Sequence, residues 1–486
     1  MIVGEPIYLA CLVPVAAGTY ALPAGRPRQL FLLAVSYAYY LTFPIAFFAI
    51  LLAISSLTYV GGLLLESASK GPRAGPLLTL LIALAFAPLV FFKYLLPLMT
   101  TTPHAEGANW QLTMAQIVLP IGLSFYTFAA VGYLIDVYLG VVRAERNPVQ
   151  VALFTGFFPY VTAGPIPRTT DVMPQLELRG RFEADRTMQG VREILLGVVM
   201  KFWIADSLAV PSAEAYANLT HAIPLEKLVA TLLFAFQIYA DFAGYSLIAI
   251  GSARLLGIDV PDNFQQPYLS QSLAEFWRRW HISLVKWLRD YVFNPISIRW
   301  RRQQRIAIPL GMILTLVLVG IWHGAGWGFL VFGALHGVML AVAYFTKSRR
   351  DRVIAAVGVP NFVVVPGRII ITFAIVALSL VLIRAQTLTE ALYVYREIFS
   401  SRLVDELQHL FSAHPDAFTY IHLRDNITNI ALIAALVAGD VFARTKLQLA
   451  RLPAALQGTL YAACVLSILY QVISQGAPRV FVYFQF

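Results

Sequence analysis

Charged residues are scarce in this sequence. Only 13% of its 486 residues are Asp, Glu, Lys or Arg, whereas 59% are hydrophobic and the mean hydropathy is +0.70. A soluble domain carries roughly a quarter charged residues, so the composition excludes an ordinary cytosolic enzyme, a disordered chain and a nucleic-acid-binding arm. We therefore expect a multi-pass membrane protein.

Cysteine is almost absent as well. The sequence contains only Cys11 and Cys464, both in apolar segments, so neither a disulfide framework nor a CxxC metal site is available. It also lacks the G-x-S-x-G nucleophile elbow, the G-x-x-x-x-G-K-[ST] phosphate loop and the H-E-x-x-H zinc pair. We expect no bound metal or cofactor, and no covalent intermediate on serine or cysteine is required.

Apolar runs extend over the whole chain. A transmembrane helix needs about 20 predominantly apolar residues, and this template predicts an all-α, polytopic membrane protein with about 11–12 spans, forming one membrane-embedded domain over 1–486. The candidate spans lie near 4–22, 29–43, 45–65, 76–99, 114–139, 190–210, 228–257, 306–322, 327–346, 361–384, 427–444 and 454–475. Basic residues follow the first span and none precede it, which is the reverse of a secretory signal.

The net charge of +10 indicates the orientation of these spans. Lys and Arg gather in alternate loops, whereas the loops at 100–113, 211–227 and 385–426 are poor in them. Basic loops are cytoplasmic in most membrane proteins, so both termini are predicted to lie outside. The basic clusters are Lys70 and Arg73; Arg143, Arg146 and Arg168 to Arg192; Arg299 to Arg305; Lys347 to Arg352; and Arg444 to Arg451.

Two further stretches do not fit the pattern of a span. Residues 154–168 are apolar but broken by prolines and a glycine, which predicts a re-entrant or cavity-lining loop. Residues 270–295 open with a possible capping box, Ser272 to Glu275, and their apolar residues recur at intervals of three and four. The basic side chains Arg278, Arg279, Lys286 and Arg289 lie away from that stripe, so we predict one amphipathic helix at the cytoplasmic interface.

Histidines next to tryptophans are the leading candidates for chemistry. His323 follows Trp322 in the glycine-rich segment GIWHGAGWG at the end of an almost charge-free span, and His281 follows Trp280. Ionisable groups at membrane depth are functional hypotheses by default. The alternatives are a glycine packing seam with a hydrogen-bonded core histidine for His323, and an interface histidine for His281.

Three other ionisable residues are weaker candidates. His336 lies too far from His323 to share a helical face, so we interpret it as a supporting or structural residue. Asp241 could orient a histidine, but a carboxylate that braces helices is the plainer interpretation for both Asp241 and Asp136. An imidazole base in a site without water suits acyl transfer from a thioester to a hydroxyl group.

Five segments between residues 157 and 392 resemble the membrane-bound O-acyltransferases (MBOAT), within them the bacterial branch of alginate O-acetyltransferases and teichoic-acid D-alanyl transferases. In order they are FFPYVTAGPIPR, QIYADFAGYSLIAIG, NFQQPYLSQSLAEFWRRWHISLVKWLRDYVFNPI, GIWHGAGWGFLVFGALHG and LIRAQTLTEA. The resemblance places the core motifs within 150–392 and implies that His323 is the catalytic base and His281 a second active-site residue. It also implies a helical shell around a central tunnel, in a bacterial cytoplasmic (inner) membrane.

The same resemblance implies a reaction and its partners. An acetyl group would pass from acetyl coenzyme A, or from an acyl-carrier thioester, toward a hydroxyl group of an exported or cell-surface polysaccharide. Arg278, Arg279, Lys286 and Arg289 would bind the donor's phosphates, although anchoring to anionic lipids explains those charges equally well. The expected partners are membrane lipids and an extracytoplasmic acetyltransferase. The element Ile383-Arg384-Ala385 favours the polysaccharide-acetylating branch.

The C-terminal tail, residues 476–486, adds one hypothesis. Its F-x-Y-x-x-F pattern resembles the tail of a small accessory protein of teichoic-acid D-alanylation, which implies that Tyr483 relays the acyl group outside the membrane. The alternative is an aromatic anchor at the membrane interface.

Two other functions stay open at this point. Within the family, the alternative is D-alanyl or other acyl transfer to teichoic acid or peptidoglycan. From another class, a polytopic transporter or flippase of lipid-linked sugars would use the proline-broken loop as a passage. Transporters usually scatter charges through their spans, whereas here the polar residues gather at two tryptophan-histidine pairs.

Overall fold

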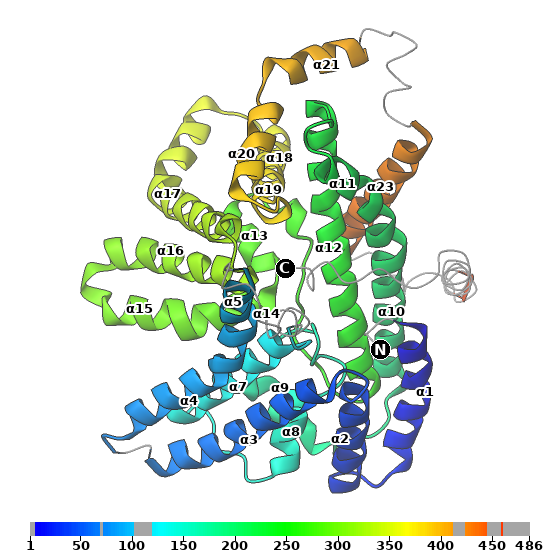
Figure 1. The fold of residues 1–486 in the computed structure, drawn as a ribbon, viewed down its shortest axis with the longest axis vertical. Coiled ribbons are helices and arrows are strands. Elements are labelled where there is room, and N and C mark those ends of the chain that lie inside the picture. Colours follow the sequence, from blue (N-terminus) through cyan, green and yellow to red (C-terminus); the bar gives the residue numbers. More distant parts are fainter. Residues whose placement is uncertain (1–4, 69–70, 102–118, 412–422, 445–457, 460–486) are drawn as a thin grey trace, which may run out of the picture. The chain divides into compact units, whose positions relative to one another are not determined.

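Helices make up all the regular secondary structure in the described part of the chain. The computed structural model describes residues 5–68, 71–101, 119–411, 423–444 and 458–459 (Figure 1). Seven of the described helices are long and apolar enough to cross a membrane. They cover Ile45–Ala68, Ala74–Met99, Ala184–Ala217, Pro224–Leu255, Arg301–His323, Trp327–Val357 and Asn361–Arg384. The predicted all-α membrane protein is thereby confirmed.

The other predicted spans fall on shorter helices or outside the described residues. The spans near 4–22, 29–43, 114–139 and 427–444 coincide with α1 (Pro6–Ala21), α2 (Arg26–Tyr40), α7 (Leu123–Tyr138) and α23 (Leu423–Arg444). Whether these four cross the membrane stays a prediction. Apart from residues 458–459, the span near 454–475 lies outside the described residues, as does the tail 476–486 with Tyr483.

The chain divides into two compact units, of which the first holds residues 1–197 and 245–263. Within it α3, α4 and α7 pack against one another, and α8 packs on α2 and α3. Besides α1, α2 and α7, its helices are α3 (Ile45–Ala68), α4 (Ala74–Val90), the π-helix η1 (Phe91–Leu95), α5 (Leu96–Thr101), α8 (Pro148–Gly156), α9 (Thr169–Val172), the 3-10 helix η2 (Met173–Glu177) and α10 (Ala184–Val198).

The proline-broken loop after α8 is buried in this unit. Every side chain from Leu153 to Pro167 is shielded from solvent, so protein groups must satisfy its irregular backbone. The N–H of Phe158 donates to Ser36 Oγ at 3.2 Å, and the N–H of Gly164 donates to the carbonyl oxygen of Tyr160 at 3.0 Å. The loop is thus non-helical and held by protein groups, as the sequence predicts; that it lines a cavity stays a prediction.

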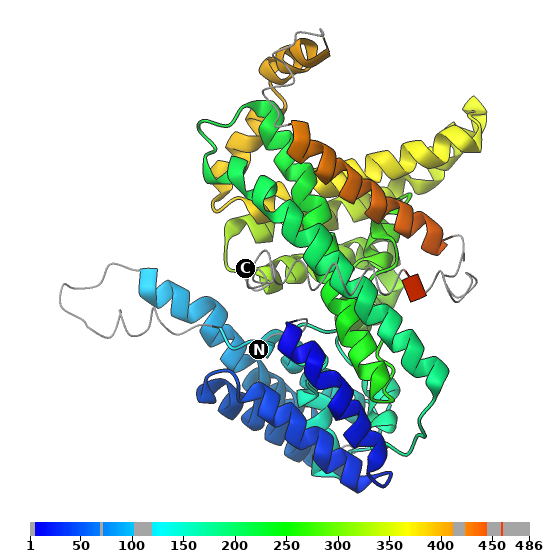
Figure 2. The ribbon, with the colours of Figure 1, turned by 90° about the vertical axis from the view of Figure 1, so that its right-hand side faces the viewer.

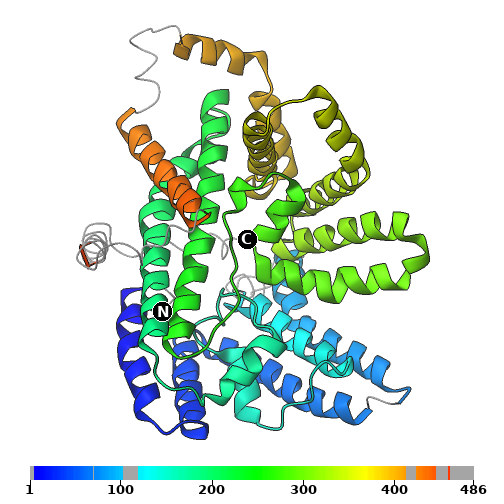
Figure 3. The same cartoon turned by 180° about the vertical axis from the view of Figure 1, so that it is seen from behind.

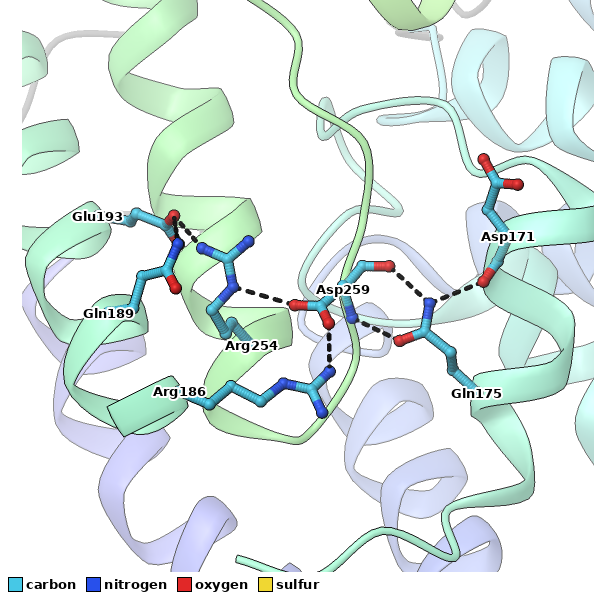
Figure 4. A network of polar contacts seen from close by, with 7 residues as sticks. All are labelled: Asp171, Gln175, Arg186, Gln189, Glu193, Arg254 and Asp259. Carbon is cyan, nitrogen blue, oxygen red and sulfur yellow. Dashed lines mark hydrogen bonds and ion pairs between the residues drawn. The ribbon is translucent and has the colours of Figure 1, made fainter. Parts of the chain in front are cut away.

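The first unit also contains a polar network that the sequence does not predict (Figure 4). Asp259, in the loop after α12, accepts hydrogen bonds from Arg254 Nε at 3.0 Å and from Arg186 at 2.8 Å. Gln175 bonds both the N–H and the carbonyl oxygen of Asp259, at 2.8 and 2.9 Å, and Arg254 also pairs with Glu193. Each arginine therefore has a carboxylate partner, and the network ties three segments of this unit together.

The second unit holds residues 198–244 and 264–486. Within it α16 packs along α17 and against α15, and α23 packs on η3 (Figures 2 and 3). Its elements are η3 (Val199–Ala205), α11 (Asp206–Ala217), the first part of α12 (Pro224–Leu255), η4 (Pro267–Leu269), α13 (Leu273–Arg279), α14 (Ile282–Leu288), η5 (Arg289–Phe293), α15 (Asn294–Arg299), η6 (Arg301–Gln303), α16 (Gln304–His323), α17 (Trp327–Val357), α18 (Asn361–Ser379), α19 (Val381–Arg384), α20 (Leu388–Ile398), α21 (Ser401–Phe411) and α23. That the whole chain forms one domain around a tunnel stays a prediction.

Candidate functional site

The segment that carries His281 is two helices rather than one. Ser272 caps the start of α13, since the N–H of Glu275 donates to Ser272 Oγ at 3.2 Å, and the Glu275 carboxylate accepts from the N–H of Gln271 at 2.8 Å. The helix ends at Arg279, Trp280 is extended, and His281 has a left-handed backbone with φ of 45°. The prediction of a single amphipathic helix over 270–295 is therefore wrong.

The break also changes the environment of this segment. The side chains from Trp280 to Leu284 are all buried, whereas a helix lying on the membrane surface would bury only one face. The left-handed residue turns the chain between α13 and α14, so that consecutive side chains enter the protein interior. His281 is only 2% exposed.

His323 is the last residue of α16 and is 9% exposed. The helix hairpin that holds it is closed by glycines, because a Cβ on Gly320 would overlap the carbonyl oxygen of Phe329, and a Cβ on Gly333 would overlap that of Leu316. The glycine packing seam considered in the sequence is therefore present. This seam brings α16 and α17 together at His323, and a catalytic role of this histidine stays a prediction.

The second unit brings the two tryptophan-histidine pairs together. The ring of Trp322 lies 5.7 Å from that of His281 and 5.1 Å from that of His323, between centroids. Phe242 meets the imidazole of His281 edge to face at 4.7 Å, and Trp280 is buried among Tyr239, Tyr268 and Phe276. Two buried imidazoles thus share one cluster of aromatic rings.

Electrostatics keep His281 uncharged. This residue lies outside the candidate membrane-spanning helices. Burial lowers the pKa of the His281 imidazole well below its usual range, and positive charge on His323 lowers that pKa further. A neutral imidazole offers one nitrogen as a donor and one as an acceptor. At neutral pH His281 therefore offers one hydrogen-bond donor and one acceptor.

His336 has a different environment, in which both ring nitrogens make hydrogen bonds. Trp277 Nε1, which is a donor only, gives a hydrogen bond to His336 Nδ1 at 3.3 Å, and His336 Nε2 lies 2.8 Å from Ser379 Oγ. Because Ser379 donates its own proton to the carbonyl oxygen of Val376 at 2.6 Å, the proton of His336 must sit on Nε2. Its Phe332 neighbour, 4.4 Å away, also contacts His323 at 6.4 Å.

Asp241 belongs to a buried charge cluster. Lys201 Nζ lies 2.7 Å from Asp241 and 2.9 Å from Asp206, and all three side chains are buried. The cluster joins α12 to η3 and α11. Lys201 is not among the predicted site residues, although a lysine inside the apolar run 190–210 indicates a buried charge.

The four basic residues of the 270–295 segment are not equivalent. Arg279 pairs with Glu275 at 2.6 Å, and Arg289 pairs with the adjacent Asp290 at 2.8 Å. Arg278 and Lys286 are exposed, and neither takes part in an ion pair among the described residues. That any of the four binds a phosphate stays a prediction. Asp136 is buried in α7 of the first unit, and its role stays a prediction.

Comparisons with known proteins show which family this chain is similar to. A family model described as MBOAT, membrane-bound O-acyltransferase family, matches residues 143–384. A protein of Azotobacter vinelandii named "probable alginate O-acetylase AlgI" is 35% identical over 409 residues, covering 82% of this chain and 78% of the relative.

Two other relatives carry different names. The peptidoglycan O-acetyltransferase of Helicobacter pylori is 28% identical over 82% of this chain and 79% of its own length. The teichoic acid D-alanyltransferase of Streptococcus thermophilus is 33% identical, but over 46% of this chain and 56% of its own length. His281, His323 and Arg384 all lie inside the region that the family model matches.

Proposed function

This chain belongs to the membrane-bound O-acyltransferase family, and from that premise we propose that it acetylates the hydroxyl groups of an exported or cell-surface polysaccharide. The acyltransferase activity follows from membership of this family. The alternative function, a transporter or flippase of lipid-linked sugars, is therefore not needed to explain the sequence. Acetyl transfer is favoured over D-alanyl transfer because the alginate and peptidoglycan O-acetylating relatives match along 82% of this chain, whereas the D-alanyl transferases match along 46%.

The observation that carries the mechanism is the pair of buried imidazoles beside Trp322. His323 acts as the general base: it takes the proton of the acceptor hydroxyl, here the phenol of the relay residue Tyr483, as that oxygen attacks the acetyl carbonyl of the thioester. The tetrahedral intermediate then expels the thiolate, which leaves as the free thiol by taking a proton. His281 orients the reacting groups through its donor and acceptor nitrogens. The burial of both rings excludes water, which limits hydrolysis of the donor.

Donor and acceptor approach this site from opposite sides of the membrane. The donor is acetyl coenzyme A or an acyl-carrier thioester, whose phosphates are bound by Arg278 and Lys286. Both residues lie in the segment 270–295, which is predicted to be on the cytoplasmic side of the membrane. An extracytoplasmic acetyltransferase completes transfer to the polymer, with Tyr483 as the relay; full activity of a Tyr483→Phe protein would remove the relay from this proposal. We propose that the protein lies in the bacterial inner membrane, with both termini outside.

The proposal is tested by acetyl release from radiolabelled acetyl coenzyme A, using the purified full chain in nanodiscs. We expect turnover that His323→Ala lowers by at least about a hundredfold, within the range of general-base contributions. The matched control is His221→Ala, because His221 is an exposed histidine, and it should keep wild-type turnover. Equal rates for wild type and His323→Ala would refute the general base; no reaction with either acetyl coenzyme A or a carrier thioester would refute the donor.

A further inference from the structure

Asp440 is the single charged residue in a long apolar stretch of α23. No other Asp, Glu, Lys or Arg occurs between Asp425 and Arg444, and the side chain of Asp440 is half-buried. A carboxylate in an apolar helix is costly, so such a residue usually has a specific partner and a function. Asp440 also lies outside residues 143–384, which the family model matches.

The partner of Asp440 is Tyr239, on α12. The Tyr239 hydroxyl lies 2.9 Å from Asp440 Oδ1 and 3.0 Å from Oδ2, and it donates its proton to this carboxylate. A hydrogen bond to an ionised carboxylate is roughly twice as strong as one between neutral groups. Both residues belong to the second unit, in which α23 packs on η3. The bond therefore fixes the hydroxyl end of the Tyr239 side chain to α23.

The ring of Tyr239 contacts the residue that precedes His281. It lies 6.2 Å from the ring of Trp280 and 5.2 Å from the ring of Tyr268, between centroids. The rings of Trp280 and Tyr268 are stacked at 6.1 Å, and all three rings are buried. The Tyr268 hydroxyl donates to the carbonyl oxygen of Ala235 at 2.6 Å, which fixes this ring to α12. A shift of the Tyr239 ring therefore reaches His281 through one intervening residue.

A second set of ring contacts leads from Tyr239 to the imidazole itself. The ring of Phe264 lies 5.9 Å from that of Tyr239 and 5.1 Å from that of Phe242. Phe242 in turn meets the imidazole of His281 edge to face at 4.7 Å. Because protein interiors are closely packed, a displacement at one ring is transmitted to the next. Tyr239 is thus connected to both the main chain and the side chain of His281.

The main chain of His281 depends on such support. A φ of 45° is unfavourable for a residue with a Cβ, and it persists only where the surrounding structure holds it. In this conformation the imidazole lies 5.7 Å from the ring of Trp322, which also contacts His323 at 5.1 Å. The placement of one imidazole relative to the other therefore depends on contacts that extend to Asp440.

We propose that Asp440 and Tyr239 are positioning residues of the acyltransferase. Their hydrogen bond holds the ring of Tyr239 against Trp280 and thereby holds the His281 imidazole in the orientation that acetyl transfer needs. Both residues act through Trp280 and His281, and α23 is part of the catalytic apparatus although the family model ends before it. This inference rests on the proposed function, which assigns the orientation of the reacting groups to His281.

The first test measures kcat and KM for acetyl release, per folded molecule of the full chain in nanodiscs. Asp440→Leu removes the acceptor and Tyr239→Phe removes the donor, and each should lower kcat at least about tenfold, since a misplacement of about 1 Å can cost about a hundredfold. The KM for acetyl coenzyme A should stay within about twofold, because the lost interaction acts in the transition state. The double variant should be no slower than the slower single variant, because both changes remove the same bond.

The rescue variant is Asp440→Asn, whose amide oxygen still accepts from Tyr239, so kcat should stay within about threefold of wild type. The matched control is Tyr395→Phe, which removes another half-buried tyrosine hydroxyl of the second unit, the donor to the carbonyl oxygen of Leu378 at 2.9 Å. This control should keep the wild-type kcat. Wild-type kcat in Asp440→Leu, or an equal loss in Asp440→Asn or in Tyr395→Phe, would overturn the proposal.

A spectroscopic readout separates positioning from a loss of folded protein. The full chain is labelled with 5-fluorotryptophan at its 8 tryptophans, and the fluorine resonance of Trp280 is identified by its absence in Trp280→Phe. Asp440→Leu and Tyr239→Phe should shift this resonance in the folded protein, whereas Tyr395→Phe should leave it unchanged. An unmoved resonance in both variants refutes the link from Asp440 to Trp280. Absence of acetyl release from the wild-type protein instead refutes the proposed function, so the two failures are distinguishable.

Discussion

Trp322 lies between two histidines: its ring centroid is 5.7 Å from that of His281, which is 41 positions earlier in the chain (322 − 281), and 5.1 Å from that of His323. The indole is buried with both imidazoles. It therefore sets the spacing of the two titratable groups and keeps water from the space around them.

Replacement of this indole should lower activity more than it lowers stability. Trp322→Phe keeps an aromatic ring and should retain part of the acetyl-release rate, whereas Trp322→Ala leaves a cavity that costs about 3–5 kcal/mol and frees both imidazoles to move. We expect at least a tenfold loss of turnover in the folded fraction of Trp322→Ala. Trp300→Ala is the control, because Trp300 is 42% exposed; full turnover of Trp322→Ala would contradict the spacing role.

The hydrogen bonds of His336 predict a structural phenotype. His336→Leu leaves the Trp277 N–H without an acceptor and Ser379 Oγ without a donor, and each buried unsatisfied group costs about 1–3 kcal/mol. We expect a lower unfolding temperature and an unchanged pH profile of the remaining turnover, since both nitrogens of His336 are engaged. Ser379→Ala should destabilise less. A shifted pH profile in His336→Leu would instead show that this histidine takes part in proton transfer.

Removal of Lys201 should be severe because it leaves two buried carboxylates facing each other. Breaking a buried ion pair by deleting one partner costs about 3–5 kcal/mol, so Lys201→Met should unfold readily in a thermal melt. Adding Asp206→Asn and Asp241→Asn should restore much of the lost stability. Lys286→Met, at an exposed lysine, controls for the loss of charge, and failure of the triple variant to recover would argue against this cluster as the cause.

The lowered pKa of His281 predicts that acid destabilises the fold. An unfolded histidine titrates near 6.5, whereas burial keeps the folded His281 neutral to lower pH. Below pH 6.5 the unfolded state therefore binds more protons, and stability falls by up to about 1.4 kcal/mol per pH unit until the folded imidazole is protonated. Thermal melts between pH 7.5 and 5 should show a weaker acid effect in His281→Asn than in wild type. An identical acid effect in both proteins would contradict this assignment.

Some features were predictable because they depend on local sequence. The length of apolar runs predicts α3, α12, α16 and α17, and the capping box at Ser272 and Glu275 predicts where α13 begins. The W-H-G and R-R-W-H motifs also identify the histidines that the second unit brings together.

Other features depend on contacts distant in sequence. The apolar spacing of three and four continues past Trp280, so nothing local predicts the break at His281. The partners of Lys201 and Arg384 come from other helices. Neither the ion pair of Lys201 with Asp241 nor the contact of Arg384 with the Tyr216 ring produces a periodic pattern in the sequence. Which residues form such pairs depends on how the helices pack, and a single sequence does not show that packing.

The left-handed backbone of His281 has a consequence for mutagenesis. Residues with a Cβ pay a conformational penalty at φ of 45°, which glycine avoids and asparagine tolerates. Replacing His281 with alanine has two effects: it removes the imidazole, and it introduces a residue that disfavours the left-handed backbone of this turn. Glycine and asparagine separate them, because either keeps the chain direction between α13 and α14 and removes only the ring. A scan with alanine alone would assign to chemistry a defect that belongs in part to the main chain.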